Sequence, residues 1–355
     1  MNINSSIKKY QVYFKDDLGF ISELQCGKQT FFVIDQKVYE LYQELFKDIE
    51  KEKIYLIQAQ EENKTIDTVL EICEESIKLN AKRNMHLISI GGGITQDITG
   101  FAANVLYRGI HWTFIPTTLL AACDSCIGGK TSLNYKHYKN LLGTFFPPDD
   151  IYICPYFFDT LSEKDFNSGL GEVVKFNIMR GEERITQIEQ DLPKMLARDQ
   201  KVINDYVKTS LEFKKDFVEQ DEFDRGRRVL LNFAHTFGHA IESITSYDIP
   251  HGAAVALGTL MANYVSWQRG YISGGQQKRI ENIIRNITSD YVLKDNFNLS
   301  NVLQAMKKDK KQTDEHLTVV LFVNDRLQLK ICHDLQKTEL EKAINYIKHF
   351  LNGEA

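Results

Sequence analysis

The sequence predicts a doubly wound α/β domain followed by a mainly α-helical domain. Short β-rich runs alternate with helical patterns up to about residue 155, and helical patterns dominate from Asp159 to about Ser246. Strands that alternate with helices indicate a mostly parallel sheet covered by helices. A chain of 355 residues is also too long for one ordinary core, so we place the two domains at 1–156 and 157–355.

Three β-rich runs build the Rossmann-like first domain. They are predicted at Phe31–Ile34, Ile54–Ile57 and His86–Ile90. Helical character follows the first run from Val38 to Ile49, and apolar residues recur at helical spacing from Ile66 to Ile77. In the second domain, two late apolar runs on either side of Asn324-Asp325-Arg326 predict a small hairpin, Leu317–Val323 with Leu327–Ile331.

Composition and charge argue against several classes of protein. The net charge of -5 argues against nucleic acid as a partner but allows a local basic pocket for an acidic substrate. No run of about 18 apolar residues is present, so we expect no membrane span. The N-terminal residues lack the layout of a signal peptide, and the six cysteines are scattered, which favours reduced thiols in a cytoplasmic protein.

Two features of the first domain are typical of nucleotide binding. Gly91-Gly92-Gly93 follows a strand and precedes a helical run from Asp97 to Leu106, where backbone N–H groups can approach a phosphate. A tight turn explains these glycines equally well, and the G-x-G-x-x-G spacing is absent. Asp35 ends the first strand, where a carboxylate can accept from a ribose hydroxyl or simply be exposed.

Residues 115–131 combine hydroxyls, an acid, paired glycines and a lysine. Gly-Gly-Lys-Thr ends the segment as it ends a P-loop, but Asp124 occupies the position of the first glycine, so that motif is not matched. Lys130 still suits a phosphate. Cys123 and Cys126 form a C-x-x-C pair, which we interpret as two packed thiols rather than a redox or zinc pair.

The second domain carries potential metal ligands. His235 and His239 lie one helical turn apart, and His251 follows a short loop. Glu172 and Lys175 come earlier on one face of another predicted helix. Glu172 with two of the three histidines would supply the ligands of a catalytic zinc site, although any single histidine is more simply a core or surface residue. The pattern is not H-E-x-x-H, which argues against a zincin protease.

The motifs, together and in this order, resemble those of the 3-dehydroquinate synthases, which are sugar-phosphate cyclases. The resemblance covers roughly residues 30–325. Its most specific pieces are PTTLLAACDSCIGGKTSLN, KNLLGTFFPP, GLGEVVKF and RRVLLNFAHTFGHAIES followed by PHGAAVALG. It implies a dehydroquinate synthase-like fold, a homodimer, NAD and one divalent metal, zinc or cobalt.

The resemblance also implies three groups of site residues. The metal ligands are Glu172, His235 and His251. The NAD-contacting positions are Asp35, Glu61, Lys64, Gly92, Gly93, Asp97, Thr117, Thr118, Leu120, Lys130, Lys139, Thr160 and Leu161. The substrate-binding or catalytic positions are Asp124, Lys130, Asn140, Lys175, Lys214, Arg228, Asn232, His239, Lys310 (rather than Lys311), and Arg108, which would reach the neighbouring subunit's site.

The implied reaction converts 3-deoxy-D-arabino-heptulosonate 7-phosphate to 3-dehydroquinate and phosphate. NAD oxidises the C5 hydroxyl, which acidifies the C6–H; phosphate is eliminated, the hydride returns, and the ring opens and closes by an aldol step. The metal would polarise the C4 and C5 oxygens. Lysines and arginines would hold the anionic groups, and His239 is our candidate for moving a proton.

Departures from the family pattern leave the exact substrate open. Gln96 stands where glycine is common, Lys37 where asparagine is, Asp224 where glutamate is, and Phe176-Asn177 where Tyr-Gly is frequent. The alternatives are a cyclase acting on another sugar phosphate such as sedoheptulose 7-phosphate, a metal-dependent polyol dehydrogenase, and a non-catalytic dimeric scaffold. Family-typical residues at Asn232, His239 and the late lysine favour 3-dehydroquinate synthase.

Overall fold

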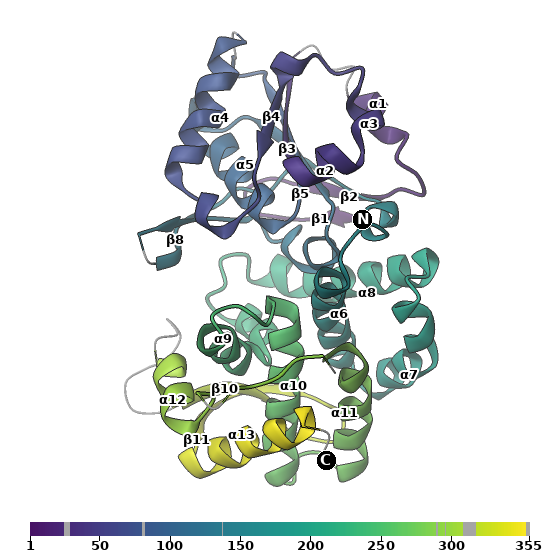
Figure 1. Cartoon of the computed structure of the whole chain (residues 1–355), viewed down its shortest axis with the longest axis vertical. Coiled ribbons are helices and arrows are strands. Elements are labelled where there is room, and N and C mark those ends of the chain that lie inside the picture. Colours follow the sequence, from purple (N-terminus) through teal and green to yellow (C-terminus); the bar gives the residue numbers. More distant parts are fainter. Residues whose placement is uncertain are drawn as a thin grey trace. The chain divides into compact units, whose positions relative to one another are not determined.

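The chain folds into two units (Figure 1). The first unit comprises Met1–Leu161 and Ile203–Phe223, and the second comprises Ser162–Val202 and Asp224–Ala355. The computed structural model describes residues 1–24, 29–79, 82–136, 138–288, 290–294, 296–307 and 317–352.

A mostly parallel sheet forms the core of the first unit. Within the described residues it has seven strands in the order β1-β2-β9-β6-β5-β3-β4, and only the β1–β2 pair is antiparallel. The strands are β1 (Asn2–Ile3), β2 (Tyr10–Phe14), β3 (Thr30–Asp35), β4 (Ile54–Ile57), β5 (His86–Gly91), β6 (His111–Pro116) and β9 (Asp150–Ile153). The three predicted strands are confirmed as β3, β4 and β5. Near-continuous apolar runs fit strands covered on both faces.

Helices lie on both faces of this sheet, which confirms the doubly wound prediction (Figure 1). They are α1 (Phe20–Leu24), α2 (Gln36–Leu41), α3 (Gln43–Phe46), α4 (Ile66–Lys78) and α5 (Gly93–Val105). The single helix expected from Val38 to Ile49 is instead divided into α2 and α3 at Tyr42, whose φ of -124° is not helical. The Tyr42 hydroxyl is 3.0 Å from Thr160 Oγ1, and this tertiary contact accompanies the break.

The strand order reverses between β3 and β5. From β3 the chain moves outward to β4, then crosses back to β5 and continues through β6 in the opposite direction. Ligands of open α/β sheets bind beyond the carboxyl ends of the strands at such a reversal. Asp35 ends β3 and Gly91 ends β5, on adjacent parallel strands in register. The two predicted nucleotide-binding features therefore share this edge of the sheet.

The second unit is largely helical, as predicted, with one small antiparallel hairpin. Its elements are α6 (Glu163–Ile178), α7 (Glu182–Leu196), α9 (His235–Ile244), α10 (His251–Gln268), α11 (Gly274–Thr288), α12 (Leu299–Lys307), β10 (Leu317–Phe322), β11 (Leu329–Leu335) and α13 (Lys337–Leu351). Helix α8 (Gln200–Gln220) belongs mainly to the first unit. Helix α10 is buried on almost every side and contacts α6, α9, α11 and α13.

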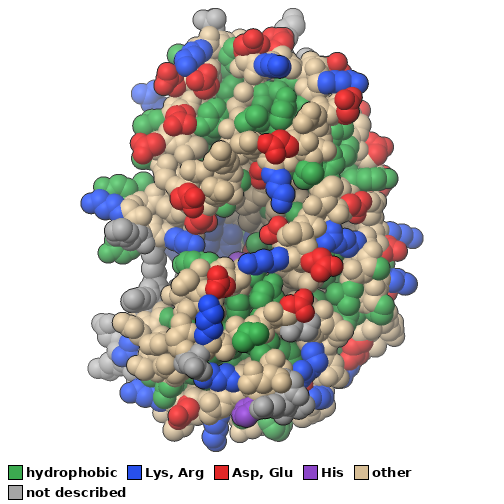
Figure 2. Space-filling view, viewed as in Figure 1, with side chains coloured by type: hydrophobic (Ala, Val, Ile, Leu, Met, Phe, Trp, Pro, Cys, Tyr) green, Lys and Arg blue, Asp and Glu red, His purple; other side chains and the backbone are tan. Residues whose placement is uncertain are grey.

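The described surface carries charges of both signs. Lys and Arg side chains are interspersed with Asp and Glu side chains on the face shown in Figure 2.

Within the described residues, no helix combines the length and the apolar character that a membrane span requires.

Burial of His86 at the start of β5 is expected to make unfolding depend on pH. Burial lowers its pKa below 6.5, and the ring bonds Thr113 Oγ1 at 2.9 Å. The imidazole takes up a proton more readily in the unfolded chain than in the folded one. The free energy of unfolding is therefore unaffected by His86 above pH 6.5 and falls as the pH drops below 6.5. The urea midpoint of the wild type should fall between about pH 7.5 and about pH 5.5, and we expect His86→Gln to make this fall smaller. His111→Gln, on the exposed neighbouring histidine, should retain it; an unchanged slope in His86→Gln would contradict this account.

Candidate functional site

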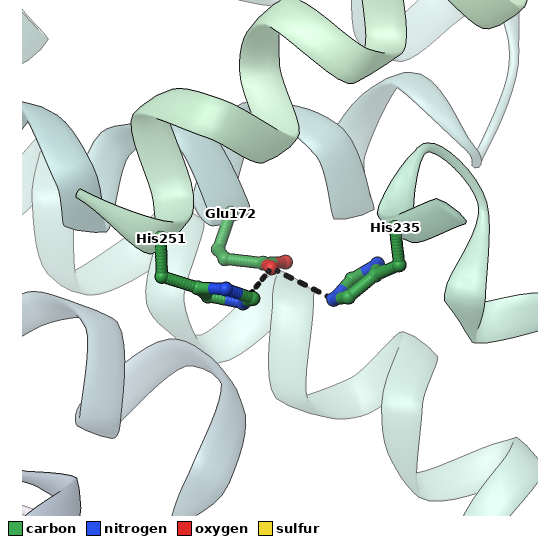
Figure 3. Close-up of side chains that lie close together, drawn as sticks. All are labelled: Glu172, His235 and His251. Atoms are coloured by element: carbon green, nitrogen blue, oxygen red, sulfur yellow. Dashed lines mark ion pairs between the residues drawn. The ribbon is translucent and has the colours of Figure 1, made fainter. Parts of the chain in front are cut away.

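Three side chains from separate helices converge in the second unit (Figure 3). Glu172 comes from the middle of α6, and His235 and His251 are the first residues of α9 and α10. Glu172 Oε1 lies 3.3 Å from His235 Nε2 and 3.4 Å from His251 Nε2. One carboxylate and two imidazoles within such reach form a ligand set that suits a divalent metal.

Glycines bring the three helices close enough for this convergence. A Cβ on Gly252 would lie 1.7 Å from Ser168 O, and one on Gly171 would lie 2.0 Å from Gly252 O, so α6 and α10 touch backbone to backbone. In the same way, a Cβ on Gly258 would lie 2.5 Å from Ala234 O, just before His235. The glycines of GLGE and HGAAVALG therefore set the spacing of the ligands.

Both histidines present Nε2 to Glu172 because Nδ1 is engaged elsewhere. His235 Nδ1 is 3.2 Å from Phe233 O, and His251 Nδ1 is 3.0 Å from Glu242 Oε2. Sequence reasoning missed Glu242. A signal was present, because Glu242 follows His235 by seven residues and His239 by three, which places all three on one face of α9.

The surroundings of Glu172 fit a metal. The side chain is fully buried, and neither oxygen has a hydrogen-bond partner of acceptable geometry among the described residues, although Lys175 Nζ lies 2.7 Å from Oε2. Burial raises the pKa of Glu172, but Lys175 and His235 outweigh it and hold that pKa well below 4.5. A buried, ionised carboxylate with unused lone pairs is a good ligand for a cation.

The two imidazoles differ in charge preference. Burial and the nearby Lys175 lower the pKa of His235 to about 4. Burial also acts to lower the pKa of His251, but its contacts with Glu172 and Glu242 raise it to about 10. His235 is thus a neutral ligand near neutral pH, whereas metal binding at His251 must displace a proton.

Other predicted substrate residues of the second unit lie on α6, on α9 and on the turn that leads into α9. The His239 ring centroid is 5.4 Å from that of His235 and 5.9 Å from that of His251. Lys175 is buried and donates to Leu231 O at 3.2 Å. Arg228, also buried, and Asn232, which donates to Val229 O at 2.9 Å, belong to the 3-10 turn Arg227–Asn232 that leads into α9.

A polar network in the first unit joins several predicted nucleotide and substrate residues. Lys64, which is buried, forms an ion pair with Asp97 and donates to Asn140 Oδ1 at 2.6 Å. Asp97 accepts from the Ser132 backbone N–H at 3.1 Å and from its hydroxyl at 3.0 Å. Burial raises the pKa of Asp97, and the contacts with Lys64 and Ser132 only partly offset this rise. The network links α5 to the hairpin of β7 (Lys130–Tyr135) and β8 (Tyr138–Phe145).

Two residues of this network were not predicted. Ser132 bonds Asp97, and Asn134 donates to Glu61 Oε1 at 2.9 Å and accepts from the Asn140 N–H at 2.9 Å. Their alternate positions in β7 place both on one face of the strand. Two polar residues with that spacing were the available signal, but their partners are far away in sequence.

The glycine turn after β5 has the geometry of a close backbone approach. Gly92 caps α5, and a Cβ there would lie 3.1 Å from Thr118 Cγ2. The Thr117 N–H donates to Gly91 O at 2.9 Å, so the segment after β6 lies against the turn. The Asp35 carboxylate caps α2 through the Lys37 N–H at 2.9 Å, and burial raises its pKa.

Asp124 and Lys214 form a second polar pair in the first unit. Buried Lys214, on α8, donates to Asp124 Oδ1 at 2.7 Å and to Asp124 O at 2.6 Å. Asp124 belongs to the π-helical turn Ala121–Ser125, and such turns often mark functional sites. Gln96, a departure from the family pattern, bonds Ser125 in both directions, at 2.8 and 2.6 Å.

The remaining predicted residues are spread along the chain. Arg108, Lys130 and Lys139 are exposed on the first unit. Leu120 precedes the π-helical turn, and Thr160 and Leu161 follow the 3-10 turn Pro155–Phe158. Lys310 and Lys311 lie outside the described residues.

The C-x-x-C pair has the character of packed thiols. Cys123 and Cys126 are both buried and form no disulfide. Burial raises the pKa of Cys126 to about 12, which suppresses the reactive thiolate.

Comparison with known sequences identifies the family. The sequence matches the 3-dehydroquinate synthase N-terminal family over residues 54–168 and the 3-dehydroquinate synthase C-terminal family over residues 169–312. The 3-dehydroquinate synthase of Clostridium tetani (strain Massachusetts / E88) is 36% identical over 346 residues, which cover 95% of this chain and 92% of that relative.

Two solved structures share the fold across nearly the whole chain. One is 2-epi-5-epi-valiolone synthase from Streptomyces hygroscopicus subsp. jinggangensis 5008 with NAD+ and Zn2+ bound (TM-score 0.84, 23% identity, 95% of this chain and 96% of that one). The other is 2-deoxy-scyllo-inosose synthase complexed with carbaglucose-6-phosphate, NAD+ and Co2+ (TM-score 0.82, 22% identity, 98% of this chain and 99% of that one). The chain shares its fold with these two synthases, and the family matches place it among the sugar-phosphate cyclases. The chain belongs to the 3-dehydroquinate synthase family.

Proposed function

We propose that this chain converts 3-deoxy-D-arabino-heptulosonate 7-phosphate to 3-dehydroquinate and phosphate, using NAD and one divalent metal. The observation that carries the proposal is the convergence of Glu172, His235 and His251 around buried carboxylate oxygens that have no hydrogen-bond partner among the described residues. The 3-dehydroquinate synthases among its sequence relatives, and the NAD+ with Zn2+ or Co2+ bound in the two structural neighbours, support it.

The two units would supply different parts of the chemistry. When bound, NAD supplies a reversible hydride acceptor and the metal supplies a Lewis acid. Glu172, His235 and His251 would hold the metal. The glycine turn at Gly92, where the N-terminus of α5 favours a phosphate, and Asp35 would hold NAD at the sheet edge.

The chain's own charged groups would position the substrate. Lys130, Lys214, Arg228 and Arg108 would bind its phosphate and carboxylate by charge-assisted hydrogen bonds. With these groups fixing the phosphate, a phosphate oxygen of the substrate would take the C6 proton. His239, whose ring lies 5.4 Å from that of His235, would move a proton at its imidazole nitrogen, which can both donate and accept one.

A phosphate-release assay tests the proposal against its alternatives. The metal-free protein would be supplied with NAD and with zinc or cobalt, and offered heptulosonate phosphate or sedoheptulose 7-phosphate in parallel. We expect release from heptulosonate phosphate without net NADH. Preference for sedoheptulose 7-phosphate would reassign the substrate, and net NADH from glycerol would favour a polyol dehydrogenase instead.

We also propose that the protein is a cytoplasmic homodimer. Exposed apolar side chains gather on the β7–β8 hairpin, where Tyr135, Tyr138 and Leu141 are 46%, 63% and 44% exposed, and contacts with a second copy would cover them. The cysteines of the described residues form no disulfide, which suits a reducing compartment.

Mixed dimers test whether Arg108 reaches the partner's site. Arg108→Ala and Glu172→Ala should each be inactive alone. A dimer purified with one chain of each, through two affinity tags, should regain about half of the wild-type activity, because one of its two sites is then complete. A matched dimer of Glu172→Ala with His235→Ala should stay inactive. An inactive Arg108→Ala/Glu172→Ala dimer, or a monomer in light scattering, would contradict this role.

A further inference from the structure

Helix α9 contributes a second carboxylate to the candidate metal centre. Glu242 Oε2 is 3.0 Å from His251 Nδ1, on the side of the ring opposite to Glu172. Its side chain is 13% exposed, and that of His251 is 32% exposed. The backbone of Gly238, one turn before Glu242, lies against α10, where a Cβ would meet Val255 Cα at 3.1 Å. This close packing fixes the distance between Glu242 and His251.

The contact decides which nitrogen of His251 faces the metal ligands. A neutral imidazole has one N–H and one lone pair, and an acceptor at Nδ1 keeps the proton on that nitrogen. The lone pair of Nε2 is then directed to the side of Glu172, 3.4 Å away. A carboxylate partner also increases the basicity of a ligating imidazole more than a neutral acceptor does.

The two histidines are not equivalent in this respect. The partner of His235 Nδ1 is the neutral carbonyl of Phe233, 3.2 Å away, whereas the partner of His251 is the Glu242 carboxylate. His251 is also the more accessible ring, with 32% of its side chain exposed against 13% for His235. A more exposed ring has more freedom to rotate and benefits more from an anchor.

We propose that Glu242 is a positioning residue that fixes the tautomer and orientation of His251 and thereby sets the metal affinity of the centre. This inference rests on the proposed function. The rival is a second metal bound by His239, Glu242 and His251, whose ligand atoms also lie within 4.8 Å of one another. A second metal would need His251 Nδ1 as its ligand, and it would have to replace the contact of that nitrogen with Glu242.

Metal titration of four proteins tests the proposal. The metal-free wild type, Glu242→Gln, Glu242→Ala and Asp248→Asn would each be titrated with Co²⁺ and Zn²⁺ by calorimetry, with the visible spectrum of the cobalt form recorded. We expect one metal per chain in the wild type and a 10–100-fold weaker affinity in Glu242→Ala, the range found when such outer partners are removed. Glu242→Gln keeps the shape and an acceptor oxygen but loses the charge, so its affinity should be intermediate.

Asp248→Asn is the matched control. It removes one carboxylate close to Glu242 in sequence, but the Asp248 side chain is 68% exposed and pairs with Lys294. It should bind metal as the wild type does. Saturating metal should restore most of the turnover of Glu242→Gln, which a general loss of structure would not allow. Equal thermal midpoints of the metal-free proteins would show that all are folded.

The outcomes distinguish a failure of the positioning role of Glu242 from a failure of the proposed function. Wild-type affinity and an unchanged cobalt spectrum in Glu242→Ala would overturn the positioning role alone. Two metals per wild-type chain, falling to one in Glu242→Ala, would establish the rival second site instead. A wild type that binds neither metal would overturn the proposed function and this inference with it.

Discussion

Replacing Glu172 with glutamine is expected to abolish metal binding and to reduce turnover by about 10³-fold or more. The carboxylate is the one charged ligand of the proposed centre, and both of its oxygens are buried. A Lewis acid contributes several kcal/mol to the transition state, and a loss of about 4 kcal/mol corresponds to about 10³ in rate. Calorimetric titration with Zn²⁺ and the phosphate-release assay would measure the two effects.

The same substitution has a second effect, which a companion variant separates. Lys175 is 1% exposed and 2.7 Å from Glu172 Oε2, so glutamine leaves a buried ammonium without its counter-charge. Removing one partner of a buried pair costs about 3–5 kcal/mol of stability. We expect Glu172→Gln/Lys175→Met to regain stability while metal binding stays absent. Metal binding or full turnover in either variant would remove Glu172 from the centre.

Replacing Gly252 with alanine is expected to damage both folding and metal binding. The new Cβ would lie 1.7 Å from Ser168 O and 2.7 Å from Ser168 C, and neither backbone atom can rotate away. Helices α6 and α10 would have to separate, which would carry Glu172 away from His251. Overpacking of this kind costs about 1–3 kcal/mol and occasionally more. Urea unfolding and Zn²⁺ titration should both show the loss.

Gly275→Ala is the control for that experiment. Gly275 lies in the first turn of α11, and the nearest atom to its added Cβ is Ser273 Oγ at 3.8 Å, an ordinary contact. We expect stability to rise by about 0.4–1 kcal/mol, because alanine restricts the unfolded chain, and metal affinity to stay constant. If Gly252→Ala behaves as Gly275→Ala does, backbone contact between α6 and α10 does not set the ligand spacing.

Local patterns predicted the parts of this fold that local sequence determines. The apolar run at His86–Ile90 forms β5, and the histidines of HTFGH lie in the first turns of α9. Both were predictable because the apolar run and the helical spacing are patterns of residues that are close together in the sequence. Tyr42 shows the limit: helical spacing continues through it, but a contact with Thr160, far along the chain, accompanies the break between α2 and α3. Tertiary contacts override propensity at such positions.

The site residues also divide into those that the sequence predicted and those that it did not. The resemblance named Glu172, His235 and His251, and the structure brings them together. It did not name Glu242 or Ser132, whose roles depend on partners nine and thirty-five residues away. The role of such a glutamate or serine can be assigned only when the fold shows which group its side chain contacts.

The buried ion pair of Lys175 with Glu172 bears on the order in which the protein is assembled. A cysteine-rich zinc module needs its ion in order to fold, since its ligands have no other stabilising partner. Here an ammonium 2.7 Å from the carboxylate already balances its charge, so we expect the polypeptide to fold without an ion and to bind one afterwards. Because the affinities of such sites follow a general order among divalent ions, the occupant would then depend on which ions the cell supplies.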